Sequence, residues 1–154
     1  MDRKDLEILR NLVNDSRLSL GELSEITGLA VSTIHKRIMK LTKEEYIERF
    51  TIILNPEKFG CVTAFLLVDA DSEKIPSIVE RLKAEEDILE IYESLGSHNL
   101  ILKIRASSLE ILKGVVNKIS NTEGVYSFEF YLATTRFKEE SWKPERIKER
   151  VSVG

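Results

Sequence analysis

Residues 19–41 read SLGELSEITGLAVSTIHKRIMKL, and this stretch decides the fold of the N-terminal part of the chain. At helical period it separates into two short helices joined by a tight turn. Ser19 and Glu22 form an S-x-x-E capping box that begins the first helix. Gly28 supplies the turn, because the backbone there needs a positive φ that glycine adopts without steric penalty. The spacing therefore predicts a helix-turn-helix.

The second helix of this stretch has one apolar face and one polar face without acids. Ile34, Ile38 and Leu41 repeat at i, i+4 and i+7, so they are expected to face the core. No Asp or Glu stands between Gly28 and Lys43, against four Lys or Arg residues. Hydroxyls and cations on such a helix suit a DNA major groove, which is lined with phosphates and base-edge acceptors. The predicted DNA-contacting residues are Ser32, Thr33, His35, Lys36, Arg37 and Lys40.

An ordinary solvated helix face is the alternative interpretation of this polar face. Arg37 has an alternative of its own, because it lies about 60° from the core face and also fits an ion pair with an acid of the first helix, Asp2 to Asn14. The net charge of −3 argues at first against a DNA-binding protein. Residues 1–50 are neutral, however, with nine basic and nine acidic residues, and residues 51–154 carry the negative balance. This distribution indicates a protein that docks one helix on DNA rather than one that coats DNA.

The composition is that of a globular protein with one ordinary domain or two small ones: 154 residues, 42% hydrophobic and 32% charged. No apolar run approaches the length of a membrane span, and the N-terminus lacks the apolar core of a signal peptide. The single cysteine, Cys61, excludes an internal disulfide and a multi-cysteine zinc site. We therefore expect a cytoplasmic protein with no membrane partner, no metal and no cofactor.

Four parts are predicted along the chain. Residues 1–50 form a winged helix-turn-helix whose first helix is Asp2 to Asn14. Tyr46 to Leu54 is predicted to be a strand or a two-stranded wing. The remaining parts are a linker strand and connector (51–61), a sandwich domain (62–138) and a tail (139–154). The tail reads either as a surface helix or as a frayed end.

The sandwich domain shows the order β-α-β-β-α-β, which is typical of a ferredoxin-like α+β fold. The predicted strands are 63–69, 88–95, 99–104 and 125–135, and the predicted helices are 76–84 and 109–119. A sheet with helices on one face should alternate apolar and polar side chains, but residues 64–68 and 100–102 are apolar on both faces. We therefore expect the sheet of a second copy to cover the open face. The resulting homodimer presents two recognition helices to a pseudo-palindromic operator.

The chain resembles the leucine-responsive/asparagine-regulator (Lrp/AsnC) family of transcription regulators over residues 2 to 139. The resemblance is strongest at residues 23–29, LSEITGL, and continues through 32–34, 37–38, 41, 50–51 and 55–60. It implies a winged helix-turn-helix joined to a ligand-sensing sandwich that dimerises and often assembles into tetramers or octamers. It also implies a small-molecule effector, commonly an amino acid, bound between dimers near the hairpin turn. In this chain the turn consists of Gly96, Ser97, His98 and Asn99.

Two departures from the family pattern lie next to the recognition helix. Ala30 stands where the family commonly has Ser, and the lost cap costs about 1 kcal/mol unless Ser32 substitutes for it. Glu45 stands where the wing turn usually carries glycine, which is expected to reshape the wing and adds an acid close to DNA.

The third departure is the hairpin turn, where the family's Gly-x-Tyr-Asp pattern is replaced by Gly96-Ser97-His98-Asn99. An amino-acid ligand needs a negative group for its ammonium, and Asn99 supplies no charge. Phe128 and Phe130 stand where relatives often have Thr and are expected to fill ligand space. We therefore expect no ordinary amino acid as the effector.

Two other classes of function deserve comparison. Siroheme decarboxylases look similar in architecture and have a histidine near the effector turn, where this chain has His98. A basic recognition helix weighs against such an enzyme, and the sequence has no nucleophile elbow, phosphate loop or metal-ligand spacing. An architectural protein that wraps DNA would favour a basic chain, whereas this chain is acidic. The sequence therefore favours a regulator over an enzyme.

Overall fold

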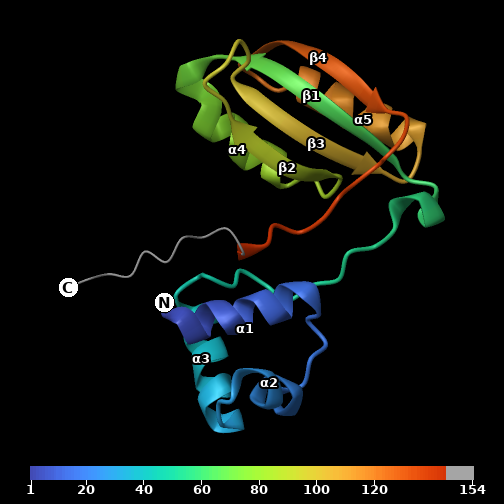
Figure 1. Cartoon of the computed structure of the whole chain (residues 1–154). Helices are drawn as coiled ribbons and strands as arrows, with labels where there is room; N and C mark the ends of the chain where they lie inside the picture. The colour runs from blue at the N-terminus through green and yellow to red at the C-terminus, as the bar shows by residue number, and fades with distance from the viewer. Residues whose placement is uncertain (145–154) are drawn as a thin grey trace. The chain divides into compact units, whose positions relative to one another are not determined.

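The computed structural model of the chain describes residues 1–144. They form two compact units, one made of Met1–Ile53 with residues 138–144 and the other of Leu54–Phe137 (Figure 1). Residues 145–154, most of the predicted tail, lie outside the described residues. Every helix among the described residues is too short or too polar to span a lipid bilayer.

Three helices make up the first unit: α1 (Arg3–Asn14), α2 (Leu20–Thr27) and α3 (Val31–Lys43). Their apolar stripes meet in a small core. It consists of Ile8, Leu12, Leu23 and Ile34, with Leu18, Leu20, Leu29 and Ile38 packed against it. As predicted, Gly28 ends α2 with φ 69°. The predicted helix-turn-helix is therefore confirmed.

The helix starts differ in their caps. The Ser19–Glu22 capping box of α2 is confirmed, with Glu22 N donating to Ser19 Oγ at 3.2 Å. A second capping box begins α1, where Asp5 N donates to Asp2 Oδ1 at 2.9 Å and Asp2 N donates to Asp5 Oδ2 at 2.7 Å. Ala30 leaves α3 without a side-chain cap, as predicted.

Residues 46–54 form no strand, so the strand predicted over this segment and the linker strand are wrong. The chain leaves α3 through a tight turn, in which Tyr46 N and Ile47 N both donate to Leu41 O, and Glu45 has φ 60°. The exposed apolar side chains beyond this turn are Phe50, Ile52, Ile53 and Leu54. A strand needs a neighbouring strand for its backbone hydrogen bonds, and none of the described strands pairs with this segment.

The second unit is an antiparallel four-stranded sheet with two helices on one face. Its strands are β1 (Val62–Ala70), β2 (Ile88–Glu93), β3 (Leu100–Ala106) and β4 (Val125–Ala133), in the spatial order β2-β3-β1-β4. Its helices are α4 (Ile75–Lys83) and α5 (Leu109–Ser120). The short 3-10 helix Pro56–Phe59 leads into β1. The predicted β-α-β-β-α-β order and the ferredoxin-like α+β fold are confirmed.

Both helices lie on the same side of the sheet, behind it in Figure 1. The buried side chains of this side alternate along the two central strands, as a half-covered sheet requires. The core is built from Ala64, Leu66, Val68, Leu100, Leu102 and Ile104 of the strands, and from Ile78, Leu82, Leu112, Val115 and Ile119 of the helices.

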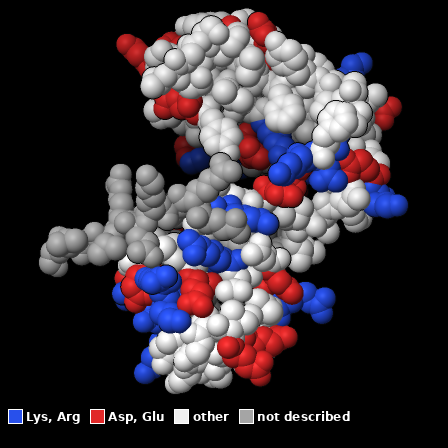
Figure 2. All heavy atoms as spheres, in the orientation of Figure 1, with Lys and Arg blue, Asp and Glu red and all other residues white. Residues whose placement is uncertain are grey.

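The other side of the sheet is not covered by any described part of its own unit. On this open face β1 places Leu67 beside Ile101 of β3 and Phe65 beside Tyr131 of β4. Phe65, Ile101 and Tyr131 are 40%, 36% and 52% exposed. Figure 2, which views the sheet from this side, shows mostly uncharged atoms with charges toward the margins. The open face carries an apolar patch, as the sequence pattern indicated, although Lys103 lies opposite Phe65 and Glu129 lies opposite Leu67.

Candidate nucleic-acid interface

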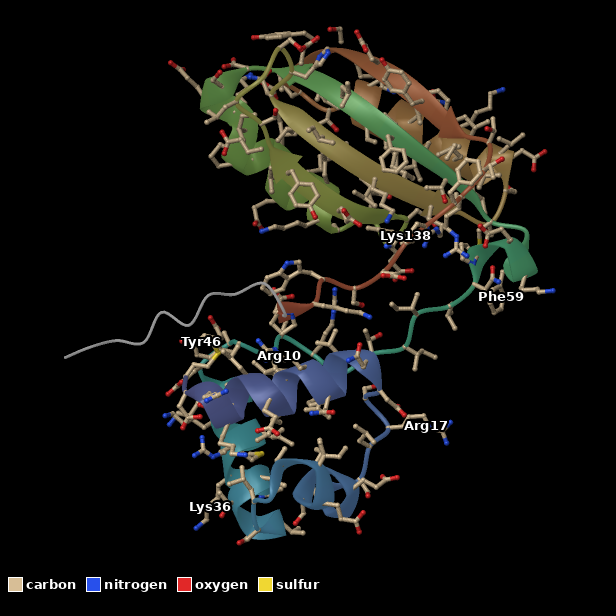
Figure 3. All side chains as sticks on the ribbon, viewed as in Figure 1. Arg10, Arg17, Lys36, Tyr46, Phe59 and Lys138 are labelled. Carbon is tan, nitrogen blue, oxygen red and sulfur yellow. The ribbon has the colours of Figure 1, made fainter. Side chains whose placement is uncertain are left out.

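The outer face of α3 presents four of the six predicted DNA-contacting side chains to solvent. These four are Ser32, His35, Lys36 and Lys40. Thr33 is half-buried at the edge of this face. Lys36 points away from the three-helix unit in Figure 3. Among the described residues no side-chain hydrogen bond or ion pair engages Lys36, so its ammonium is available for a phosphate or a base edge.

Lys40 is held only weakly by its own helix. Its Nζ lies 3.8 Å from Glu44 Oε1 one turn later, and both side chains are largely exposed. An exposed pair of this kind contributes little to stability, so a DNA phosphate can replace the glutamate. An open hollow of about 420 Å³ adjoins the face; its lining residues are Met1, Asp2, Asp5, Thr33, Lys36, Arg37 and Lys40.

Arg37 differs from the other five predicted residues, because its guanidinium is engaged by α1. Its Nη1 donates to Asp2 Oδ2 at 2.7 Å and to Asp5 Oδ1 at 2.6 Å. The Arg37 hydrogen bond is the main cause that holds the pKa of Asp2 below its ordinary value, and the same bond raises the pKa of Arg37. The geometry therefore supports the ion-pair interpretation of Arg37, with two acids rather than one.

The hairpin turn between β2 and β3 places His98 in a cluster of polar side chains from three segments. His98 Nδ1 lies 2.9 Å from Asp69 Oδ1, and His98 Nε2 lies 3.7 Å from Glu129 Oε1. Ser127 Oγ donates to Asp69 Oδ2 at 2.6 Å. This serine, and then His98, hold the pKa of Asp69 below its ordinary value. Gly96 and Ser97 are exposed at the tip of the turn.

The His98 cluster has the residue types of a hydrolase triad but not the arrangement. Ser127 and His98 both bond Asp69, whereas a nucleophilic serine must bond the histidine that takes its proton. Among residues 1–144, no group of three or more His, Cys, Asp or Glu side chains is placed to hold a metal ion.

Asn99 joins the turn to β1. Its N–H donates to Val68 O at 2.9 Å, and its Oδ1 accepts from Ala70 N at 2.7 Å. The carboxamide oxygen therefore supports the fold of the hairpin. The expectation that Phe128 and Phe130 fill ligand space beside this turn stays a prediction, and the strand register places both side chains on the helix side of the sheet. Alternate residues of a strand face opposite sides, and these two register with buried residues of β1 on the helix side.

Sequence reasoning missed the acids that complete both clusters. The capping box of Asp2 and Asp5 was not predicted, although their spacing of three residues is that of a capping box. Asp69 and Glu129 reach His98 only through the register of β1 and β4. The available signal is that both are acids within otherwise apolar strands.

Comparison with known proteins identifies the family. Residues 1–48 match a winged helix-turn-helix DNA-binding domain, and residues 63–143 match the Lrp/AsnC ligand binding domain. The HTH-type transcriptional regulator FL11 of Pyrococcus abyssi is 35% identical over 145 residues, which cover 94% of this chain and 96% of FL11. The HTH-type transcriptional regulator LrpA of the same organism is 34% identical over 127 residues, covering 81% of this chain and 90% of LrpA.

Solved structures agree with these sequence matches. The structure of E. coli AsnC superposes with a TM-score of 0.82 at 26% identity, covering 94% of this chain and 99% of AsnC. The relatives are transcriptional regulators, which speaks against the decarboxylase alternative. The resemblance to Lrp/AsnC proteins is confirmed. The chain therefore belongs to the Lrp/AsnC family and is a DNA-binding transcriptional regulator with a ligand-binding domain, not an enzyme.

Proposed function

We propose that this regulator binds a pseudo-palindromic operator as a homodimer, with the α3 helix of each copy in the major groove. The observation that carries the proposal is the outer face of α3, which has no acid and exposes Ser32, His35, Lys36 and Lys40. Lysine ammonium groups bind phosphates and guanine acceptors, and hydroxyls bond either kind of base edge. Thr33 lies at the edge of this face and completes the proposed contact set.

The proposed dimer forms through the open face of the sheet. Phe65 of β1, Ile101 of β3 and Tyr131 of β4 leave apolar surface in water on this face. A second sheet laid on it removes this surface from water, and a two-fold axis makes the two faces self-complementary. Assembly of such dimers into tetramers or octamers is proposed on the family resemblance alone.

The proposed effector site is the turn Gly96–Asn99, and the proposed effector is not an ordinary amino acid. The support comes from groups that are already engaged: Asn99 is neutral and bonded to Ala70 N, and both oxygens of Asp69 are taken by His98 and Ser127. An amino-acid ammonium needs a free negative group. Titration calorimetry with free amino acids tests this proposal. Micromolar binding that His98→Ala abolishes would contradict it.

Selection of bound genomic DNA fragments by the purified protein at near-physiological salt tests the proposed DNA recognition. The expected result is enrichment of one short pseudo-palindrome. Lys36→Ala runs in parallel, and its enrichment of the same motif is expected to be weak. If the wild-type protein recovered all fragments to the same extent, this result would instead support an architectural, sequence-independent mode of binding.

A further inference from the structure

Arg37 lies on the recognition helix, yet its guanidinium is directed at the start of α1. The Arg37 side chain is 28% exposed, and the side chain of its partner Asp5 is only 6% exposed. The second partner, Asp2, is 56% exposed. Water screens exposed ion pairs strongly and buried pairs much less. The Arg37–Asp5 bond is therefore the half of this contact that water screens less.

Each of the two carboxylates makes two kinds of bond. One oxygen of Asp2 caps the backbone of α1 at Asp5 N, and the other accepts from Arg37 Nη1. One oxygen of Asp5 accepts from Asp2 N, and the other accepts from Arg37 Nη1. The start of α1 and the side chain of Arg37 consequently form one hydrogen-bonded network.

Helix α1 is also tied to the other helix of the motif. Lys4 Nζ donates to Thr27 O at the end of α2, at 2.6 Å. One turn of α1 therefore holds both members of the helix-turn-helix, α2 through Lys4 and α3 through Arg37. A rigid frame of this kind is what a recognition helix needs, since its base contacts depend on its angle in the groove.

The same contacts make Arg37 a poor ligand for DNA phosphate. Two carboxylates face its one positive charge, so the cluster of Asp2, Asp5 and Arg37 has a net negative charge. A phosphate that approached the guanidinium would also approach both carboxylates, and like charges repel. Lys36, the preceding residue, makes no hydrogen bond or ion pair with an acid among the described side chains and is exposed.

We propose that Arg37 is a positioning residue: through Asp2 and Asp5 it fixes α3 against α1 at the angle that the major groove requires, and it contacts no DNA phosphate. The inference rests on the proposed reading of DNA by α3. It leaves five side chains of the predicted set as DNA contacts, namely Ser32, Thr33, His35, Lys36 and Lys40.

The salt dependence of operator affinity separates the two roles. The full-length protein is titrated with its selected operator by fluorescence anisotropy over a range of salt concentrations. The slope of log affinity against log salt counts the phosphates that the protein neutralises. Lys36→Gln is expected to reduce this slope by about one for each bound chain. Arg37→Gln is expected to weaken binding roughly tenfold at every salt concentration, with the slope unchanged. A slope reduced as much as in Lys36→Gln would overturn the proposal.

Asp5→Asn provides a second variant, which retains the guanidinium and removes one negative charge from the side of α3. If only the lost negative charge mattered, this variant would bind DNA more tightly. If the lost contact with Arg37 misplaces α3, the variant binds DNA more weakly. The expected result is affinity reduced about threefold to tenfold, with a wild-type circular dichroism spectrum. Tighter binding would show that Arg37 is a DNA contact held back by the acids. Wild-type protein that binds no fragment in a salt-dependent way would reject the proposed DNA recognition, and this inference with it.

Discussion

Ser19 and Ala30 occupy the same position before the two helices of the motif, but only Ser19 can cap. Ser19 Oγ accepts from Glu22 N, and Ser19 N donates to Glu22 Oε2 at 2.7 Å. Ala30 has the extended backbone of an N-cap, with φ −61° and ψ 144°, and no side chain that could accept a hydrogen bond. The recognition helix therefore begins with backbone donors that no side-chain cap satisfies.

Ala30→Ser is expected to raise the free energy of unfolding by about 1 kcal/mol, because the new hydroxyl can accept from the first turn of α3. Urea denaturation measures the change. Ser19→Ala is the matched variant, and it is expected to lower the free energy of unfolding by a similar amount. A destabilising effect of Ala30→Ser would show that the start of α3 cannot accommodate a capping side chain.

The ionisation of Asp2 is expected to make the stability of the three-helix unit depend on pH. Arg37 holds the pKa of Asp2 below its ordinary value of 3.8. A carboxyl whose pKa is lowered on folding stabilises the fold above its ordinary pKa and loses this contribution as the pH falls through the lowered value. The contribution is therefore complete at neutral pH and is lost only below pH 3.8.

Asp2→Asn is accordingly expected to lower the melting temperature at neutral pH and to have little effect below the titration of Asp2. Melting temperatures measured by circular dichroism across the acidic range test this expectation. Glu25→Gln, on the exposed side of α2, serves as the control for removal of one acid. An equal loss of melting temperature at neutral and at strongly acidic pH would contradict the assigned pKa direction.

At the scale of elements, the sequence predicted what local signals determine. The Ser19–Glu22 box, the Gly28 turn and the order of strands and helices all depend on spacings within a few residues. The strand predicted over residues 46–54 is absent because a strand forms only where another strand accepts its hydrogen bonds. Local alternation carries no information about that partner. The His98–Asp69 contact was missed for a related reason, since it depends on how the hairpin registers against β1.

Glu45 is a position after α3 where a substitution is expected to increase the stability of the protein. Its φ of 60° lies in the left-handed region, which costs a non-glycine residue about 1 kcal/mol. Glu45→Gly is therefore expected to raise the free energy of unfolding by about 0.5–1 kcal/mol, as urea denaturation would measure. Glu44→Gly is the neighbouring control: with φ −87° it gains no such relief and is expected to destabilise by a similar amount. If Glu44→Gly were more stable to unfolding than Glu45→Gly, this result would contradict the positive φ assigned to Glu45.

In the whole molecule, the open face of the sheet is expected to hold two copies together. Phe65→Lys places a charge at the centre of the open face and is expected to shift the protein from a dimer to a single chain of 17.7 kDa. Sedimentation velocity measures the mass. Leu109→Lys, an exposed position on α5, is expected to leave the dimer intact. Dissociation by Leu109→Lys but not by Phe65→Lys would place the interface on the helix side.

The outer face of α3 is proposed to read DNA, and the operator affinities of two lysine variants test this role. Lys36→Ala removes a cation from this face, and Lys58→Ala removes an exposed cation from the 3-10 helix before β1. Lys36→Ala is expected to weaken operator binding roughly tenfold or more, because each lost phosphate contact is worth about that much near physiological salt. Lys58→Ala is expected to bind like the wild-type protein. Equal affinities of the two variants would contradict the assignment of α3 as the recognition helix.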